Sequence, residues 1–526
     1  MKSQLTQRWA LPPTWLRFLI IILLVLGIFF RFVNLGQKVY WHDETFTSLR
    51  LAGYTGEDLR QKIFNGNVIG VEDLLKYQYP TSETSLMDTI RALIVEDPQH
   101  PPVYYMIARP WMKLFGNSGA TIRSVSAIIS LFIFPCIYWL CLELFDSSLV
   151  AWVAIALSAV SPVQLVFAQE AREYSLLMVI TLLSSAALLQ AMRLKTKVSW
   201  LIYAASLALG LYSLPLILLT AIGHGIYVIA IAGFRGGKTI ISYLLSSLAG
   251  FLAFVPWILL TFNSFAKVQD TTKWSSTQIP LSRLFKSWAG NISRVFFDIN
   301  FDATVSFIYT VPPILLLLIL VGYSFYFLCR TTQPQVYLFI LTMLGVPALA
   351  LILPDLVSGG MRSTVPRYLV PCFLAILLPV AYLLGNQITS SHGFQQKLWQ
   401  LIMVLLLSVG VISCVVYSQS DVWWNKKPSN IHIQSASLIN QTNRPLIISS
   451  YYETNLGELT SLSYLLDKKV RLQLVSEPNI PKITKGFSDI FVFGPSPNLK
   501  SGLEREYNSR FEPIEFSELR LWTLKK

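Results

Sequence analysis

Residues 15–33 read WLRFLIIILLVLGIFFRFV and form the first long apolar stretch of the chain. An α-helix needs about 20 mostly apolar residues to cross the hydrocarbon core of a bilayer. No small-residue cleavage site follows the run, so we interpret it as a retained first helix rather than a signal peptide. Ten more stretches of this kind follow, at 121–143, 149–168, 174–192, 198–214, 216–233, 241–262, 304–328, 336–353, 367–385 and 398–418. The sequence therefore predicts a polytopic α-helical membrane protein with about eleven transmembrane helices.

The composition supports this class and excludes others. Of the 526 residues, 53% are hydrophobic and only 13% are charged, whereas soluble domains carry roughly a quarter charged residues. The net charge of +13 comes mainly from short loops between apolar stretches, and no basic run with interleaved aromatics suggests a nucleic-acid partner. All five cysteines lie within or beside apolar segments, so we expect neither a disulfide framework nor a thiolate zinc site.

One shorter stretch, residues 101–116, decides which side each later loop faces. It contains Arg109 and Lys113, so we expect a helix lying in the membrane interface rather than a span. The basic loops then share the side of the N-terminus, with its Lys2, Arg8 and Arg17, as the positive-inside rule requires. These loops carry Arg193, Lys195, Lys197, Arg235, Lys238, Arg330 and Lys397. The loop 34–120 and the tail 419–526 are thus predicted to face outward.

The two outward regions have their own patterns. Between 34 and 99, ten acidic residues outnumber six basic ones, and apolar residues at helical spacing predict short amphipathic helices on the membrane surface (Leu74, Leu75, Leu86, Ile90, Leu93 and Ile94). In the tail, strand-like runs at 445–449, 470–475 and 489–493 alternate with helix-like runs at 458–466 and 501–507. We therefore predict a membrane domain, 1–418, that includes the loop 34–120, followed by a small extracytoplasmic α/β domain, 419–526.

Charged residues gather at the predicted outer ends of the spans, where one outward-facing pocket would collect them: Asp43, Glu44, His100, Arg123, Glu170, Arg172, Glu173, Arg362 and Arg367. Charges near a membrane are costly and mark functional sites. A midplane cluster would favour a transporter or flippase of lipid-linked sugars, which remains the alternative function. An interfacial cluster suits chemistry on a phosphate whose lipid tail stays in the bilayer. A membrane scaffold without catalytic activity is a second alternative.

The predicted side of the membrane also limits the sugar donor. Nucleotide sugars are not supplied outside the cytoplasm, so a donor there is expected to be a polyprenyl phosphate. In agreement, neither polar region contains an Asp-x-Asp or a Gly-rich phosphate loop of the kind that a nucleotide site uses.

Several short motifs in a fixed order resemble those of the GT-C membrane glycosyltransferases. They are RFVNLG at 31–36, WHDE at 41–44, HPPVYY at 100–105, Arg123 at the start of a span, SP at 161–162 and AQEAREY at 168–174. The likeness is strongest to bacterial relatives of the protein O-mannosyltransferases and of the aminoarabinose transferases that act on lipid A. It covers roughly residues 15–200, returns at PRYLVP, 366–371, and does not reach the tail.

The resemblance implies roles for individual residues. Asp43, beside Glu44, occupies the position of the family's catalytic base, and a carboxylate can accept the proton of an acceptor hydroxyl as its oxygen attacks the anomeric carbon with inversion. The leaving phosphate needs positive charge, for which the forked donors of Arg172, Arg367 and Arg123 are suited. Substrate binding falls to Glu170, His100, Tyr174 and Tyr105.

The chain departs from the family's pattern at two of these positions. Lipid A transferases have lysine before the proline pair and a second acidic residue where Tyr174 stands; here His100 precedes the prolines. This leaves open whether a divalent metal takes part. The expected function is transfer of a hexose or pentose from a polyprenyl phosphate to a protein, lipid or glycan acceptor at a bacterial plasma membrane. Asp355, in an outer loop, is expected to be ordinary surface.

Overall fold

The computed structural model describes residues 12–233, 237–300, 307–390, 392–451, 454–508, 510–517 and 520–524. Lys2, Arg8, Arg235 and the first residues of the predicted span 304–328 lie outside these ranges. The chain divides into two compact units. The first, which we call the membrane unit, comprises Met1–Leu35, Pro98–Tyr104 and Arg123–Gln419. The second, the sheet unit, comprises Gly36–Asp97, Tyr105–Ile122 and Ser420–Lys526.

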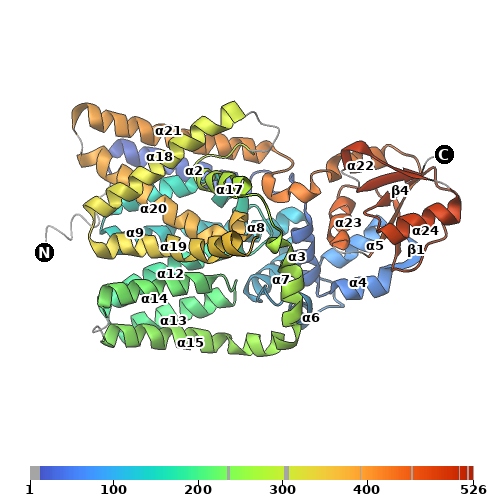
Figure 1. The fold of residues 1–526 in the computed structure, drawn as a ribbon, viewed down its shortest axis with the longest axis horizontal. Coiled ribbons are helices and arrows are strands. Elements are labelled where there is room, and N and C mark those ends of the chain that lie inside the picture. Colours follow the sequence, from blue (N-terminus) through green and yellow to red (C-terminus); the bar gives the residue numbers. More distant parts are fainter. Residues whose placement is uncertain are drawn as a thin grey trace. The chain divides into compact units, whose positions relative to one another are not determined.

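Each predicted span coincides with a helix or a pair of helices in the membrane unit. These helices lie side by side in Figure 1. In chain order they are α2 (Thr14–Phe32), α8 (Gly119–Leu131) with α9 (Ile133–Phe145), α10 (Ser148–Ala159) with α11 (Pro162–Ala168), α12 (Tyr174–Leu194), α13 (Lys197–Leu211), α14 (Ile217–Ala232), α15 (Gly237–Thr261), α18 (Phe307–Thr331), α19 (Pro334–Val357), α20 (Val370–Ser390) and α21 (Gly393–Gln419).

Not all of these helices are long enough to cross a bilayer alone. Within the described ranges eight helical segments have the necessary length and apolar character, and α10 with α11 makes a ninth if the pair counts as one span bent by 61°. The bend falls at Pro162, which has no backbone N–H to continue the first helix. The apolar helices α13 and α14 are shorter, with 15 and 16 residues. The chain is thus a polytopic integral membrane protein.

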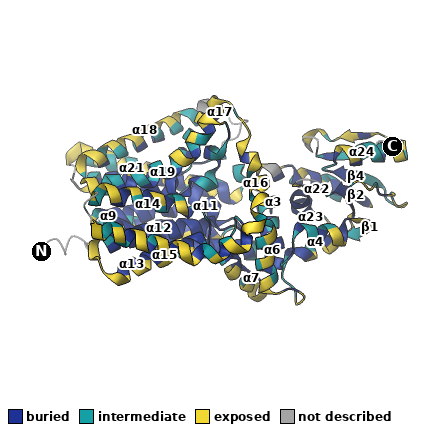
Figure 2. Ribbon diagram, turned by 60° about the horizontal axis from the view of Figure 1, so that its bottom comes forward, coloured by how far each residue is buried: buried dark blue, intermediate teal, exposed yellow. Residues whose placement is uncertain are grey.

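Burial differs across the membrane unit as lipid contact requires. Of the residues in the apolar windows of α12 and α20, 83% and 89% are buried, whereas only 28%, 22% and 28% are buried in those of α15, α18 and α19, a contrast visible for α12 and α15 in Figure 2. Helices pack closely where side chains are small. A side chain at Gly27 of α2 would lie 2.6 Å from the carbonyl oxygen of Ala159.

Three further helices, α7 (Val103–Phe115), α16 (Phe265–Thr272) and α17 (Leu281–Ser293), lie in segments between the predicted spans. α7 has 13 residues and is not among the candidate spans, as predicted for 101–116. α16 and α17 follow α15 and were not expected from the sequence.

The sheet unit is built on six strands in the order β1-β3-β2-β4-β6-β5. The three predicted strands of the tail are present as β2 (Pro445–Ser450), β3 (Arg471–Val475) and β4 (Asp489–Phe493), which pair in parallel. β5 (Phe511–Pro513) and β6 (Leu521–Leu524) extend the sheet antiparallel. The predicted small α/β fold is therefore confirmed.

Helices cover both faces of this sheet. One core joins the sheet residues Ile447 and Leu472 to Leu459 of α23 (Asn455–Ser463) and includes α22 (His432–Asn440). The other joins Val492 to Leu503 of α24 (Pro497–Tyr507). Parallel strands require such crossover helices.

The sixth strand comes from the loop that precedes the second span. β1 (Asn65–Gly70) pairs antiparallel with β3, more than 400 residues away in the sequence. The same loop forms α3 (His42–Ala52), α4 (Gly56–Ile63), α5 (Val71–Leu75) and α6 (Leu86–Glu96). The predicted helices exist, but Leu74 is fully buried in the core of the sheet unit. The expectation that this residue lies on the membrane surface is therefore wrong.

Candidate active site

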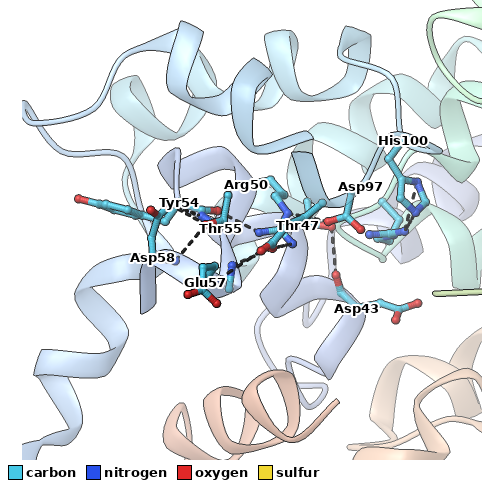
Figure 3. A network of polar contacts seen from close by, with 12 residues as sticks. Asp43, Thr47, Arg50, Tyr54, Thr55, Glu57, Asp58, Asp97 and His100 are labelled. Atoms are coloured by element: carbon cyan, nitrogen blue, oxygen red, sulfur yellow. Dashed lines mark hydrogen bonds and ion pairs between the residues drawn. The ribbon is translucent and has the colours of Figure 1, made fainter. Parts of the chain in front are cut away.

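The predicted base lies in the first turn of α3. The helix begins after Trp41, which has extended backbone, and ends at Gly53, whose φ of 89° is a left-handed conformation that glycine tolerates. Asp43 and Glu44 occupy the first turn, where the partial positive charge of the helix N-terminus stabilises carboxylates. The backbone oxygen of Asp43 accepts a hydrogen bond from the hydroxyl of Thr47, drawn in Figure 3 (3.1 Å).

Asp43 is paired with the histidine that precedes it. Its Oδ1 lies 2.9 Å from Nε2 of His42, and the two side chains are 17% and 18% exposed. On the opposite side of the ring, Nδ1 of His42 lies 3.0 Å from Oε1 of Glu458 on α23. The imidazole therefore bridges a carboxylate near the N-terminus of the chain and one in the tail.

Glu458 is in turn surrounded by positive and polar groups. Its Oε2 lies 3.1 Å from Nε2 of His432 and accepts a hydrogen bond from the hydroxyl of Ser429 (3.1 Å). Oε1 also lies 3.5 Å from the guanidinium of Arg520. Nδ1 of His432 is hydrogen-bonded to the hydroxyl of Ser461 at 2.9 Å. A continuous polar chain thus runs from Asp43 to Ser461 inside the sheet unit.

The charges along this chain are set by their neighbours. Burial alone would lower the pKa of His42, but Asp43 and Glu458 raise it to about 9. Burial alone would raise the pKa of Glu458, but the two imidazoles hold it well below its ordinary value. At neutral pH the chain therefore contains an imidazolium between two carboxylates.

Glu44 has a separate partner from the tail. Its Oε2 lies 2.5 Å from Nζ of Lys426, and both side chains are fully buried. The same ammonium lies 5.8 Å from the ring centre of Trp41. A buried charge of this kind requires its partner, because leaving either ion unpaired is strongly unfavourable.

Contacts of α3 with α23 fix the position of this first turn. The Thr45 hydroxyl donates a hydrogen bond to the carbonyl of Gly457 (3.2 Å). A Cβ at Gly457 would lie 2.7 Å from the ring of Phe46, closer than real Cβ contacts, and 3.0 Å from Cβ of His42, which is tighter than most of them. Glycine at this position therefore permits the close approach that brings Glu458 to His42.

The other end of α3 is tied to the segment after α6. Arg50 is buried and forms ion pairs with Glu96 (2.8 Å) and Asp97 (2.6 Å); Figure 3 shows the contact with Asp97. Burial alone would lower the pKa of Arg50, but Asp97 and Glu96 raise it. The predicted substrate residue Tyr105 is 1% exposed, and its phenol acts electrostatically on Arg50. Tyr105 thus lies in the packed interior of the sheet unit.

A second cluster of predicted residues lies in the membrane unit, before α12. Nδ1 of His100 lies 2.5 Å from Oε1 of Glu173, and Nη2 of Arg172 lies 3.0 Å from Nε2 of His100. Burial alone would raise the pKa of Glu173, but Arg172 and His100 lower it to about 2. The two predicted residues His100 and Arg172 are therefore brought together around an ionised carboxylate.

The surroundings of Arg172 hold this cluster in place. The Ser126 hydroxyl donates a hydrogen bond to the Arg172 carbonyl (2.9 Å), and the guanidinium lies 5.7 Å from the ring centre of Tyr174. Glu170, which was predicted to bind substrate, is 1% exposed in the same turn. Its backbone oxygen accepts a hydrogen bond from the backbone N–H of Arg172 (2.7 Å).

The remaining predicted arginines have different environments. Arg123 in α8 is 1% exposed and donates a hydrogen bond to the carbonyl of Leu35 (2.7 Å). Arg367 is half-buried in a 3₁₀ turn, Pro366–Leu369, with its guanidinium 5.3 Å from the ring centre of Trp274 and 5.6 Å from that of Tyr368.

The expectation that Asp355 is ordinary surface is wrong. Its side chain is buried, and Oδ2 accepts hydrogen bonds from the backbone N–H and the hydroxyl of Ser363, both at 2.7 Å. Oδ1 lies 3.2 Å from Arg362. Asp355 therefore organises the segment that leads to Arg367, because a carboxylate satisfies several donors of a short loop at once.

Sequence reasoning missed His42, Glu458, His432 and Lys426. For His42 a signal was available, because it stands between Trp41 and Asp43 in a recognised motif. The other three lie in the tail, to which the resemblance does not extend. In the described part of the chain, no group of three or more histidine, cysteine, aspartate or glutamate side chains is arranged to hold a metal ion.

Comparisons with known proteins bear on the class of this molecule. The model of the dolichyl-phosphate-mannose-protein mannosyltransferase family matches residues 99–260. No curated protein matches the sequence. The structure is similar to ArnT from Cupriavidus metallidurans bound to undecaprenyl phosphate, with 11% identity, a TM-score of 0.54 and 97% of each chain covered. It is also similar to the Archaeoglobus fulgidus oligosaccharyltransferase tethered with an acceptor peptide, with 12% identity and a TM-score of 0.50, over 88% of this chain and 64% of that one.

These likenesses confirm the predicted fold class and the predicted resemblance. The chain shares the fold of ArnT, which it covers almost from end to end, and its residues 99–260 match the mannosyltransferase family model. At identities of 11–12% the structural likeness concerns the fold, and function must be argued from the site.

Proposed function

We propose that the protein transfers a sugar from a polyprenyl-phosphate donor to an acceptor hydroxyl, with inversion at the anomeric carbon. The observation that carries the proposal is the carboxylate of Asp43, held in the first turn of α3 by the His42 imidazolium at 2.9 Å, in a chain with the GT-C fold. A base for this reaction must be ionised and fixed in orientation, and this ion pair favours both.

In the proposed reaction, the acceptor hydroxyl gives its proton to the carboxylate of Asp43. The acceptor oxygen attacks the anomeric carbon from the face opposite the phosphate and forms the new glycosidic bond. The bond between that carbon and the phosphate oxygen breaks, and the polyprenyl phosphate leaves with the electron pair. The departing phosphate is a stable anion, so no paired general acid of the glycosidase kind is required.

The phosphate requires positive charge, for which we propose Arg172 and Arg367. Arg172 stands between His100 and Tyr174, and its orientation is restricted by both. Guanidinium groups match phosphate oxygens with two parallel hydrogen bonds. We propose that Arg123, which donates a hydrogen bond to the main-chain carbonyl of Leu35, also contributes positive charge for the phosphate. Glu170 and Tyr105 are proposed to bind the substrate.

We further propose that the sheet unit faces the extracytoplasmic side of a bacterial plasma membrane. The basic loops of the sequence support this orientation through the positive-inside rule. The acceptor is then a protein, lipid or glycan hydroxyl on that side, and the donor is a hexose or pentose linked to a polyprenyl phosphate.

The proposal is tested by sugar transfer in membranes that contain the protein. Synthetic polyprenyl-phosphate hexoses and pentoses carrying a radiolabelled sugar are incubated with these membranes and with membranes that lack the protein. We expect protein-dependent transfer from at least one donor. Movement of label across sealed vesicles without a new glycosidic bond would instead indicate a transporter, and no protein-dependent change with any donor would refute the enzymatic function.

A further inference from the structure

We infer that Glu458 on α23 positions the proposed base Asp43 through His42, so that the tail of the chain forms part of the catalytic machinery. This inference rests on the proposed function. The tail thereby has a role in the reaction, and Glu458 is a positioning residue more than 400 positions away from the base in the sequence.

The geometry supports a connection through a single rigid ring. His42 contacts Asp43 through Nε2 at 2.9 Å and Glu458 through Nδ1 at 3.0 Å. Both ring nitrogens thereby lie within ion-pair distance of a carboxylate. Asp43 is the next residue in the same helix turn, so an imidazole held by Glu458 gives the Asp43 carboxylate a partner in a defined position.

Glu458 is itself held from several directions. His432, Ser429 and Arg520 contact its two oxygens at 3.1, 3.1 and 3.5 Å, and the side chain is 2% exposed. The neighbouring Gly457 accepts a hydrogen bond from Thr45 of α3. These contacts come from four segments of the sheet unit, so the position of Glu458 depends on the folded tail rather than on one helix.

Burial of this group has a physical cost that packing alone does not explain. A carboxylate removed from water loses several kcal/mol of hydration, and apolar residues of similar size often stabilise a core as well or better. The buried carboxylate of Glu458, with His42 and His432 beside it, therefore indicates a function that requires charge next to the predicted base Asp43. Keeping Asp43 ionised and oriented is such a task.

The charges facing His42 determine the direction of the pH effect. On its own helix the ring faces Asp43, and from α23 it faces Glu458; Glu44 in the same turn is neutralised by Lys426. A cation beside a carboxylate favours the ionised form of that carboxylate. Loss of Glu458 removes one of the two carboxylates that stabilise the imidazolium, so the positive charge beside Asp43 is held less firmly and Asp43 is expected to accept a proton more readily.

The experiment compares the Glu458→Gln variant with wild type in the full-length protein, with Glu506→Gln on the exposed side of α24 as the matched control. Transfer from an active polyprenyl-phosphate sugar is measured as kcat and as KM for the donor between pH 5 and pH 9. We expect kcat of Glu458→Gln to fall about 10- to 100-fold, the scale on which small displacements of catalytic groups act. The KM for the donor should stay unchanged, and the acid limb of the profile should move to higher pH.

The variants separate this inference from the proposed function. If Asp43→Asn abolishes transfer while Glu458→Gln retains the wild-type kcat and pH profile, the inference is overturned and the function stands. If wild type transfers no sugar, both fail. Should Glu458→Gln not accumulate in the membrane, His42→Gln interrupts the same connection while leaving Glu458 paired with His432; an unshifted pH profile in that variant likewise overturns the inference. Partial recovery in Glu458→Asp would support it.

Discussion

The buried ion pair between Glu44 and Lys426 allows a quantitative prediction. Both side chains are fully buried, and the charged atoms are 2.5 Å apart. Replacing Lys426 with methionine leaves a carboxylate without its counter-ion in the interior of the sheet unit. Breaking a buried pair in this way costs roughly 3–5 kcal/mol of folding free energy. A unit of this size loses about 2–4 °C of melting temperature per kcal/mol, so we expect a decrease of about 10 °C.

The assay is thermal unfolding of the detergent-solubilised full-length protein at pH 7. Lys468→Met is the matched control, because Lys468 forms an ion pair of similar length with Glu72 (2.8 Å) but both side chains are largely exposed. Exposed pairs contribute little to stability, so the control should melt at the wild-type temperature. In the double variant Glu44→Leu with Lys426→Met, no buried charge remains, and most of the loss should be recovered.

Equal melting temperatures for Lys426→Met and wild type would refute this reasoning, since they would mean that the pair does not hold the loop and the tail together. A double variant that is less stable than Lys426→Met would contradict the desolvation part of the reasoning.

Three other predictions follow from the site. The pKa of His42 is raised from 6.5 to about 9, so its ion pairs should contribute about 3 kcal/mol at most to the free energy of unfolding. This contribution is fully present below pH 6.5 and is lost as the pH rises through 9. The melting temperature of His42→Phe should therefore lack the decrease that wild type shows over this pH range. Gly457→Val should push α3 away from α23 and lower kcat about tenfold without changing the KM for the donor. The control is Gly290→Val, because a side chain at Gly290 would meet nothing within 4 Å. This variant should have the wild-type kcat. Arg172→Lys keeps the positive charge but loses the forked donors of the guanidinium, so the KM for the donor should rise about tenfold. The control Arg193→Lys, which affects a half-exposed ion pair with Glu143, should leave the KM for the donor as in wild type. An unchanged KM in Arg172→Lys would remove that residue from the phosphate site.

The local elements of this fold were predictable because their signals are local. Apolar runs of sufficient length located the spans, and the tail strands at 445–450, 471–475 and 489–493 lie where strand-like runs were predicted to alternate with helix-like ones. The strand Asn65–Gly70 has the sequence NGNVIG, which lacks such a pattern. Its place in the sheet depends on pairing with Arg471–Val475, and no local signal reports a partner that distant.

The same distinction applies to the candidate site. The motif order pointed to Asp43, His100 and Arg172 as candidates, and in the structure His100 and Arg172 are in contact. Which acid joins them could not be decided from the sequence, since Glu170 and Glu173 are both present; only the turn before α12 directs Glu173 to His100. Glu458 and Lys426 meet the first turn of α3 through tertiary packing, which a single sequence does not reveal. Asp355 was misjudged because it lies in the last turn of α19 and not in a loop, and only the fold brings the donors of Ser363 to its carboxylate.

The most direct test of the catalytic assignment is the rate of sugar transfer by Asp43→Asn at equal protein level, measured beside wild type and beside Asp467→Asn, an exposed aspartate of the same unit. Asparagine preserves the shape of the side chain but cannot accept the proton at neutral pH. We predict that Asp43→Asn loses at least about 10²-fold in kcat, that Asp467→Asn equals wild type, and that the wild-type product has the anomeric configuration opposite to that of the donor. Transfer by Asp43→Asn at the wild-type rate, or a product with retained configuration, would contradict the role of Asp43 as the base of an inverting glycosyl transfer.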